Sequence, residues 1–280
     1  MKRIRSLLCA ALILFLLCSC SSSSPGGETL QIYVLDVGQG DAILLRLAQG
    51  DILIDAGPEQ SQELLCLRLE QLGVKELALA IFTHPDEDHI GGADGVLSAF
   101  GAREVWINGA ESEELCLAAL MEVIERNQTE WRVVRAGESY TLGALSLFVL
   151  SPMEGNAQSG NADSISVKLT YGDVRAILTG DTDAKGEAEM LARYGAAQLD
   201  CEIYKVGHHG SNTSSTEAFL AAMSPDYALI SAGRGNSYGH PHGQVLSRLE
   251  KTGAEILRVD QIGEILLETD GVTIENKSKS

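Results

Sequence analysis

The sequence predicts an α/β protein in which two mixed β-sheets pack face to face, with helices on their outer sides. Apolar runs of strand length alternate with amphipathic helical segments in both halves of the chain, a pattern typical of sheets covered by helices. The second half repeats the layout of the first in outline. Polar and acidic side chains gather where strands end, which predicts that they meet along one edge of the sandwich.

In the first half, short apolar strands end in turns that contain glycine, proline or aspartate. A helix over residues 61–72 repeats leucine at helical spacing and ends at Gly73, which suits the left-handed position after a helix. The expected strands are 30–35, 42–47, 51–54, 77–82, 105–107, 131–134 and 145–150, and the further helices start after Gly92 and span 113–126.

The second half begins with a hairpin, whose strands 165–170 and 174–178 are joined across Tyr171-Gly172-Asp173. Ser214 and Glu217 have the spacing of a capping box, which predicts a helix start there. The other expected elements are a helix that follows Asp181 and runs to Tyr194, strands 201–206 and 227–231, helix 244–251, and strands 256–259, 265–268 and 272–274, which complete the sheet of this half.

The N-terminus predicts an export signal. Three basic residues precede a run of twelve apolar residues, 7–18, which is too short to span a bilayer. Leu17-Cys18-Ser19-Cys20 resembles the bacterial lipoprotein cleavage box, which predicts a signal peptide over 1–20, a lipid on Cys20 and a Ser/Gly tether over 21–29. The folded domain, 30–275, would then be lipid-anchored on the outer face of a bacterial membrane. An ordinary cleaved signal and an N-terminal anchor helix are the alternatives.

The chain is acidic. Its formal net charge is −18, and removal of the first twenty residues, which hold three basic side chains and no acidic one, leaves 18 basic and 39 acidic residues, a charge of −21. Such a surface repels phosphate backbones over about 8 Å in physiological salt. Tight non-specific binding to nucleic acid is therefore not expected.

Residues 83–92, Thr-His-Pro-Asp-Glu-Asp-His-Ile-Gly-Gly, carry the densest set of metal-binding side chains. They follow the apolar strand 77–82 directly and place His84, Asp86, Asp88 and His89 within six residues. Nitrogen and oxygen ligands of this kind suit divalent metals, and the set is too large for one ion with an open position. A helix cap formed by Asp86 or Asp88 is the structural alternative.

Further candidate ligands stand at other strand ends. Asp181 follows a strand and could bridge two cations or cap the next helix. His208 and His209 end another strand, and because adjacent side chains on a strand point oppositely, one of them should face the site. Asp36 ends the first strand and is expected to orient a metal-bound histidine, with a turn cap as the alternative. All six histidines fall into three close pairs, the third being His240 and His242.

Several motifs occur together over residues 30–274. They are Asp36-Val37-Gly38-Gln39-Gly40-Asp41-Ala42, Asp55-Ala56-Gly57, the segment 84–89, Leu178-Thr179-Gly180-Asp181, His208-His209-Gly210-Ser211, Asn236-Ser237-Tyr238-Gly239-His240-Pro241-His242 and the spaced Arg258, Asp260 and Gly263. In this order they resemble the metallo-β-lactamase superfamily, and more narrowly the hydrolase domain of ComEC-type competence proteins and its stand-alone lipoprotein relatives. The resemblance implies an αββα four-layer sandwich with a one- or two-metal site at the sheet edges.

The resemblance also implies ligand roles. His84 and Asp86 would hold a first metal, Asp88 and His89 a second, Asp181 would bridge them, and His208 would complete the second site. Asp86 stands where the superfamily usually has histidine, which favours Mn²⁺ alongside Zn²⁺. The superfamily's histidine before the Asp181 strand is absent, so Asp163 or Asn161 must serve, or the first site binds metal weakly. The choice between Zn²⁺ and Mn²⁺, and between His208 and His209 as ligand, stays open.

A site with two cations activates water, which supports hydrolysis of phosphodiesters or other polar esters. The resemblance implies nuclease activity on DNA, with single-stranded DNA as a candidate substrate. The chain lacks a basic groove for it, although Lys205 and Arg234 near the motif loops could meet a single phosphate. A phosphorylcholine or wall-polymer esterase and a non-catalytic binding module are the alternatives, and a monomer is favoured.

Three residues are predicted to act in catalysis: Asp88, His209 and His240. His240 lies in a Gly-His-Pro loop with no strand to aim it, so we expect it to contact substrate or to protonate the leaving group. A histidine that only caps the helix starting near Gln244 is the alternative.

Overall fold

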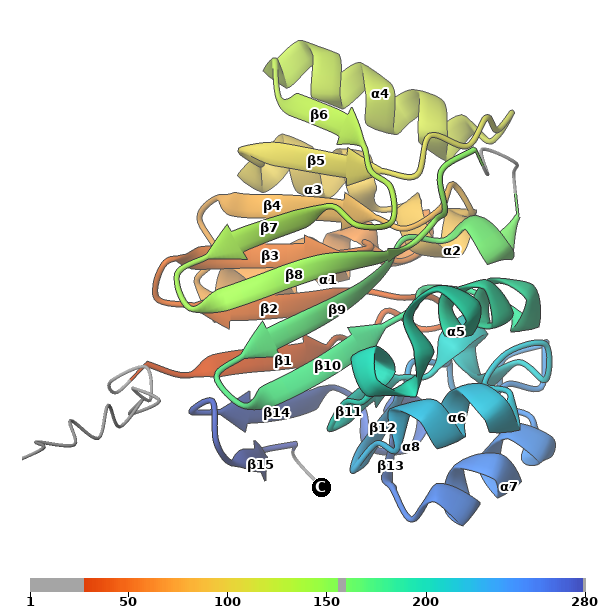
Figure 1. Cartoon of the computed structure of the whole chain (residues 1–280). Helices are drawn as coiled ribbons and strands as arrows, with labels where there is room; N and C mark the ends of the chain where they lie inside the picture. The colour runs from red at the N-terminus through yellow and green to blue at the C-terminus, as the bar shows by residue number, and fades with distance from the viewer. Residues whose placement is uncertain (1–27, 156–159, 279–280) are drawn as a thin grey trace, which may run out of the picture.

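The computed structural model describes residues 28–155 and 160–278. Two mixed sheets pack face to face with helices on their outer sides (Figure 1), which confirms the predicted fold class. The predicted signal peptide, the lipid on Cys20 and most of the tether lie outside these residues. In the part of the chain that the structure describes, we find no helix with the length and apolar character needed to cross a membrane.

The first sheet has eight strands in the order β15-β14-β1-β2-β3-β4-β5-β6. Strands from β15 to β3 pair antiparallel, and β3 to β6 pair parallel. Their bounds are β1 (Leu30–Val34), β2 (Ile43–Leu47), β3 (Gly50–Ile54), β4 (Leu77–Phe82), β5 (Glu104–Ile107), β6 (Glu130–Val133), β14 (Ile265–Thr269) and β15 (Ile274–Asn276).

The last two strands correct one sequence expectation. They were predicted to complete the second sheet, whereas β14 pairs antiparallel with β1, with Val34 opposite Ile265. This pairing covers the edge of β1 that β2 leaves open, and it places Ile265 and Leu267 in the core between the sheets. A contact between the two ends of a chain leaves no local sequence pattern.

The second sheet has seven strands in the order β13-β12-β11-β10-β9-β8-β7. Strands β10 to β13 pair parallel, and β7 to β10 pair antiparallel. Their bounds are β7 (Ser139–Leu142), β8 (Leu145–Ser151), β9 (Ser166–Tyr171), β10 (Val174–Leu178), β11 (Ile203–Lys205), β12 (Tyr227–Ile230) and β13 (Glu255–Arg258). The sequence did not predict β7, an edge strand with few apolar residues.

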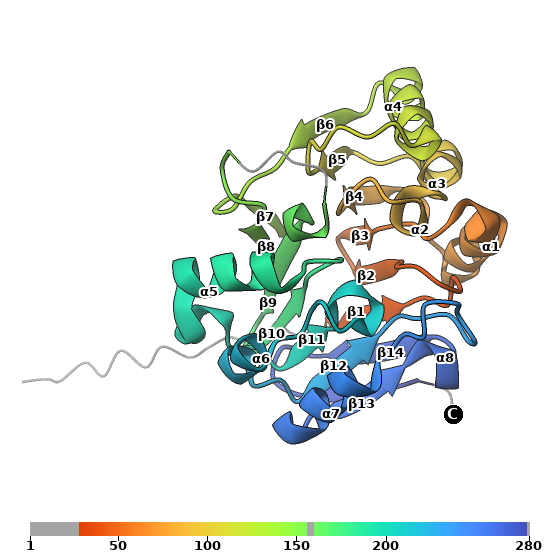
Figure 2. The ribbon, with the colours of Figure 1, turned by 90° about the vertical axis from the view of Figure 1, so that its right-hand side faces the viewer.

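Helices cover the outer face of each sheet (Figure 2). Leucines of the first group pack on the first sheet, and apolar residues of the second group pack on the second sheet. The first group is α1 (Gln62–Leu72), α3 (Ala93–Phe100) and α4 (Leu115–Asn127), and the second is α5 (Ala184–Leu199), α6 (Glu217–Met223) and α7 (Gly243–Thr252). Single-turn helices α2 (Glu87–Ile90) and α8 (Val259–Ile262) and the 3₁₀ turns η1 (Glu59–Ser61), η2 (Asn161–Asp163) and η3 (Gly207–Gly210) complete the chain.

The helix starts decide which polar residues are free for a site. Helix α5 is capped by Asp183, whose Oδ1 accepts the Lys185 N–H at 2.9 Å, so Asp181 is not the cap. Helix α6 is capped by Thr216 rather than by the predicted Ser214. Asp86 occupies the N-cap position of α2 without making a side-chain cap hydrogen bond. The capping alternatives for Asp86 and Asp181 therefore receive no support.

The topology brings the strand ends together. Strands β3 and β4 run parallel in one sheet, and β10, β11 and β12 run parallel in the other. Their C-terminal ends lead into the loops that carry Asp55, His84, Asp181 and His209, and these loops meet at one edge of the sandwich.

Candidate metal centre

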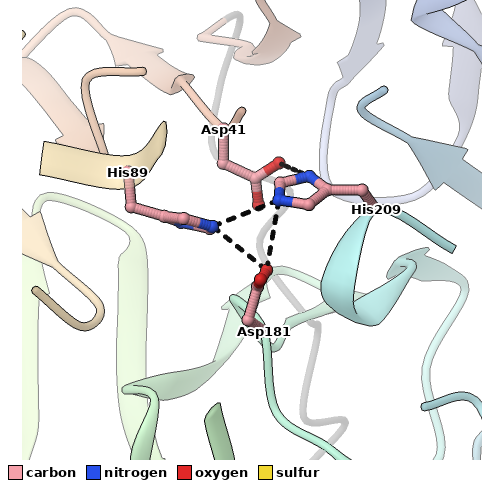
Figure 3. A group of neighbouring side chains, drawn as sticks. All are labelled: Asp41, His89, Asp181 and His209. Carbon is pink, nitrogen blue, oxygen red and sulfur yellow. Dashed lines mark hydrogen bonds and ion pairs between the residues drawn. The ribbon is translucent and has the colours of Figure 1, made fainter. Parts of the chain in front are cut away.

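Asp181 is the centre of the candidate site. It is buried directly after β10 and Gly180, and imidazole nitrogens lie near both of its carboxylate oxygens. His89 Nε2 lies 3.1 Å and His209 Nε2 3.5 Å from Oδ1, and these two rings approach it from opposite sides (Figure 3). On the other oxygen, Oδ2, His208 Nε2 lies at 3.5 Å and His84 Nε2 at 4.0 Å. The carboxylate therefore has one histidine pair for each oxygen.

The segment 84–89 contributes to both sides of Asp181. His84 Nε2 lies 3.5 Å from Asp86 Oδ2, on the side of Asp181 Oδ2. Asp88 Oδ2 lies 3.3 Å from His209 Nε2, on the side of Asp181 Oδ1. Asp86 is the N-cap residue of α2, whereas Asp88 and His89 lie within its single turn, and this change of backbone direction lets one short segment serve two positions.

His209, rather than His208, meets the second half of this segment. Its Nε2 lies 3.3 Å from both Asp88 Oδ2 and His89 Nε2. His208 turns toward the side of His84 and receives the Asn161 side-chain amide at 3.1 Å. The strand-like alternation expected of the two histidines fails because η3 is a tight turn in which both have positive φ, 50° and 52°. The geometry thus reverses the positions that were expected for these two residues.

Two buried carboxylates fix the histidine rings. Asp55 Oδ2 lies 2.8 Å from His89 Nδ1, and the same carboxylate accepts the backbone N–H and the hydroxyl of Thr83, each at 2.8 Å. His209 Nδ1 lies 2.9 Å from the carbonyl oxygen of Ser231, with Asp41 Oδ1 at 3.3 Å. Such contacts set the ring orientation and leave Nε2 directed at the site.

Asp36 does not have the orienting role that the sequence suggested. Its side chain is exposed, and its Oδ1 accepts the Gly38 N–H at 3.2 Å as a turn cap. Sequence reasoning missed Asp41 and Asp55 in this role, although both stand in the quoted motifs. Asp41 lies two residues before β2, and Asp55 follows β3 directly.

Lys205 corrects a second expectation. Its side chain is fully buried, and Nζ contacts Asp41 Oδ2 at 2.8 Å and the Val206 carbonyl at 3.0 Å, so it cannot meet a substrate phosphate. Arg234 is exposed, and its Nε donates to the Asp260 carbonyl at 3.0 Å. Of the two candidate cations, only Arg234 is open to solvent.

The carboxylates and imidazoles of the site shift each other's pKa values. Burial would raise the pKa of Asp181, but His209 and His89 outweigh it and hold this pKa well below its ordinary value. Burial would lower the pKa of His209, but Asp181 and Asp41 outweigh it and raise this pKa to about 10. The pKa of His89 is likewise well above its ordinary value, because Asp181 and Asp55 overcome the effect of burial. The cluster of carboxylates therefore stabilises positive charge in the space between them.

The residues fit a divalent metal. Among the described residues, the buried atoms without a hydrogen-bond partner include Asp181 Oδ1, His84 Nε2 and Asp41 Oδ1. An unsatisfied buried polar atom costs free energy, and a bound cation would satisfy atoms of this kind. One ligand atom from each of Asp41, His89, Asp181 and His209 lies within 4.8 Å of the others (Figure 3). Imidazole with carboxylate is a donor set for Zn²⁺ or Mn²⁺.

The remaining predicted residues lie at the rim. Asn161 contacts His208 from η2, and Asp163 is buried in the same turn, where its carbonyl accepts the Asn108 amide at 3.2 Å. The His240 ring lies 5.7 Å from that of His208 and 6.3 Å from that of His209. His240 is not a helix cap, because α7 starts at Gly243 after His242.

An αββα sandwich with histidines and carboxylates gathered at one sheet edge defines a hydrolase of the metallo-β-lactamase type. The family model "Metallo-beta-lactamase superfamily" matches residues 35–115 and 159–234, and the chain belongs to this superfamily.

Two relatives and one solved structure show what the chain is similar to. It is 31% identical to ComE operon protein 3 of Bacillus subtilis over 280 residues. This alignment covers 92% of this chain and 34% of that protein. It is 32% identical over 235 residues to competence protein ComA of Neisseria gonorrhoeae, covering 83% and 31%. The chain thus spans about a third of the length of these relatives. The metallo-β-lactamase fold protein YhfI of Bacillus subtilis superposes with a TM-score of 0.57 at 11% identity, covering 86% of this chain and 100% of that one, which shows the shared fold.

Proposed function

We propose that this chain is a two-metal hydrolase that cleaves phosphodiester bonds, as a nuclease acting on single-stranded DNA. The observation that carries the proposal is the position of Asp181, whose two oxygens each face a pair of imidazoles. A carboxylate in this position can serve two cations at once. Two-metal sites are the recurrent arrangement for phosphoester hydrolysis.

The ligand sets follow from the distances on each side of Asp181. One set is Asp88, His89 and His209, and the other is His84 and Asp86, completed by His208, Asn161 or Asp163. The abundance of carboxylates favours Mn²⁺ alongside Zn²⁺. When bound, two such cations would lower the pKa of a water molecule and would stabilise the negative charge that develops on the phosphoryl group.

Neighbouring residues of the chain hold the candidate ligand rings in a fixed orientation. Asp55 holds the His89 ring at Nδ1, and the Ser231 carbonyl holds the His209 ring at its Nδ1. Each ring therefore presents Nε2 to the site without having to reorient when a metal ion arrives. Side chains that are oriented in advance lose little conformational entropy when they bind the metal, so their orientation supports both metal affinity and the rate of hydrolysis.

His240 is placed to contact substrate. Its ring is half-buried beside His208 and His209, and its Nδ1 has no hydrogen-bond partner among the described residues. Burial, with the neighbouring His209 and His208, lowers the pKa of His240 to about 4. A neutral imidazole with an unpaired nitrogen can exchange a hydrogen bond or a proton with a phosphoryl or leaving-group oxygen.

DNA is proposed as the polymer because the relatives are ComEC-type competence proteins, one of them named as a competence protein. The acidic surface limits binding through phosphates alone, which favours a flexible single strand over a long duplex.

The test is metal content together with hydrolysis. The wild-type protein should bind close to two equivalents of Zn²⁺ or Mn²⁺ by elemental analysis, and it should cleave bis-p-nitrophenyl phosphate and a single-stranded oligonucleotide. Asp181→Asn has nearly the same shape and should lose most metal and all measurable cleavage. Asp36→Asn, an exposed aspartate outside the site, is the control and should retain both. Full metal loading of the wild type without cleavage of any phosphodiester would overturn the proposal.

We also propose that the protein is held on the outer face of a bacterial membrane by lipid on Cys20. The cleavage-box motif before Cys20 and the serine-rich stretch after it support this proposal. Detergent partitioning of Cys20→Ala should show release to the aqueous phase, and membrane retention equal to that of the wild type would contradict it.

A further inference from the structure

Tyr238 has an unusual position on the surface. It is 64% exposed, and among the large apolar side chains that are exposed in residues 28–155 and 160–278, it is the one with a ring contact to a histidine of the site. Exposure of an aromatic ring costs free energy unless another surface covers it.

The Tyr238 ring is the outermost of three nearly parallel rings. It lies 5.6 Å from the His240 ring at an interplanar angle of 22°, and the His240 ring lies 6.3 Å from the His209 ring at 27°. His209 in turn contacts Asp181. The three rings therefore form a row between solvent and the candidate metal centre, and Tyr238 forms its exposed end.

The loop that presents Tyr238 is held from within. Asn236 accepts the His240 N–H at 3.0 Å, and its amide donates to the carbonyls of His240 at 2.7 Å and Gly233 at 2.9 Å. The Gly233 N–H donates to the Gln39 side chain at 3.2 Å. These bonds close the loop around Tyr238 on both sides, so the ring can accept a partner without first ordering the backbone.

Charge gives the loop a second feature that suits nucleic acid. Arg234 is exposed four residues before Tyr238, and its Nε donates to the Asp260 carbonyl at 3.0 Å. The chain as a whole is strongly acidic, with a formal charge of −18, so phosphate contacts alone would hold a polyanion weakly. Stacking on an aromatic ring adds affinity that does not depend on net charge, and every base offers a π-face.

We infer that Tyr238 is a specificity-determining residue on which an unpaired nucleobase next to the cleaved phosphodiester stacks. This inference rests on the proposed function, and it narrows the substrate to a polymer with exposed bases. Phosphodiesters without a base, such as a choline phosphoester or a wall polymer, would gain nothing from this contact.

The test compares two short labelled oligomers, one of thymidines and one of the same length whose central nucleotides are abasic. Binding is measured by fluorescence anisotropy with a chelator present, so that no cleavage is needed. The wild type should prefer the thymidine oligomer by about 5- to 150-fold, the range for one stacked base. Tyr238→Ala should lose this preference, while Tyr238→Phe keeps it. Trp131→Ala, which removes an exposed aromatic ring on β6, is the matched control and should bind as the wild type does.

Four results would overturn the inference, and the first three concern the two oligomers. They are equal wild-type affinity for the two oligomers, an intact preference in Tyr238→Ala, and an equal loss for both oligomers in that variant, which would mean a structural role for the ring. Competition by glycerophosphocholine that depends on Tyr238, without any base preference, would assign the ring to a quaternary ammonium group and would equally overturn it. The binding assay needs no cleavage, so it tests the role of Tyr238 independently of the proposed hydrolysis. Failure of the proposed hydrolysis would instead be seen when metal-loaded wild-type protein cleaves no phosphodiester.

Discussion

Lys205 Nζ lies 2.8 Å from Asp41 Oδ2, and both side chains are buried, Lys205 at the end of β11 and Asp41 in the loop before β2. Burial would raise the pKa of Asp41, but Lys205 and His209 outweigh it and lower that pKa. Asp41 therefore stays ionised, and its second oxygen, Oδ1, lies 3.3 Å from His209 Nδ1. The pair joins the structural core of the second sheet to the candidate metal centre.

Lys205→Met should destabilise the fold strongly, because it leaves the Asp41 carboxylate buried without its partner. Removal of one member of a buried pair typically costs about 3–5 kcal/mol. Urea unfolding should show a loss on this scale. Lys251→Met, which removes a lysine from an exposed pair with Glu217, is the control and should change the free energy of unfolding far less, because solvent screens this pair. A loss in Lys205→Met no larger than the control's would contradict the prediction, and adding Asp41→Asn to it should restore part of the stability.

Asp55→Asn should weaken metal binding without removing a ligand. The amide cannot accept from both Thr83 and the His89 Nδ1–H as the carboxylate does, so the His89 ring is less well oriented. Loss of such an outer contact typically lowers metal affinity about 10- to 100-fold. Competition with a coloured chelator measures the affinity. Asp36→Asn is the matched control, because Asp36 was the strand-end aspartate that the sequence favoured for this role, and an equal effect of both variants would refute the assignment.

The difference between Asp36 and Asp55 shows how far sequence reasoning reaches in this protein. The apolar runs predicted nearly all strands and helices, because burial on one or both faces imposes a local period. The strand ends predicted where the polar groups would collect. Which strand-end carboxylate turns inward depends on the path of each loop, and both aspartates look alike in the sequence.

Two other differences have the same origin. The pairing of β14 with β1 joins residues more than two hundred positions apart, so no local pattern indicates it. His208 and His209 were expected to alternate as on a strand, whereas the positive φ of both residues in η3 sends them to opposite oxygens of Asp181. Backbone conformations of this kind are rare for residues other than glycine, and the local sequence does not announce them.

Without bound metal, the protein should lose stability as the pH rises from 7 to 9. The folded-state pKa of His209 is raised to about 10 by Asp181 and Asp41, against about 6.5 in an unfolded chain. The stability from its charged form is therefore complete below about pH 6.5 and declines as the pH rises toward 10. Urea unfolding in a chelator at several pH values measures this decline. The metal-loaded protein is the control, because its ligand imidazoles are neutral, and a flat profile without metal would contradict the prediction.

His209→Ala and His208→Ala should have different effects on metal content. His209 contacts the half of the site formed by Asp88 and His89, so its loss should remove about one metal equivalent together with activity. His208 lies 3.5 Å from the other oxygen of Asp181, at the rim beside Asn161, and is 24% exposed, so its removal should weaken the other metal only. Elemental analysis gives the number of metal equivalents in each variant, and the absorption spectra of the cobalt-substituted protein show which of the two sites is occupied. Retention of both metals in His209→Ala would return the ligand role to His208.

His240→Ala should slow phosphodiester cleavage while leaving the metal content unchanged. The His240 ring contacts the rings of His208 and His209. Among the described residues no ion pair joins it to Asp181, so it stands beside the candidate ligands rather than among them. An imidazole that exchanges a proton with the reacting group typically contributes about 10²- to 10⁴-fold to the rate. The measurement is turnover of bis-p-nitrophenyl phosphate alongside elemental analysis of the same samples. His242→Ala is the matched control. His242 lies two residues after His240, and its Nδ1 already accepts the Asn212 N–H at 3.1 Å. Loss of metal in His240→Ala would make this residue a ligand, and unchanged turnover would make it a structural part of the loop that carries Tyr238.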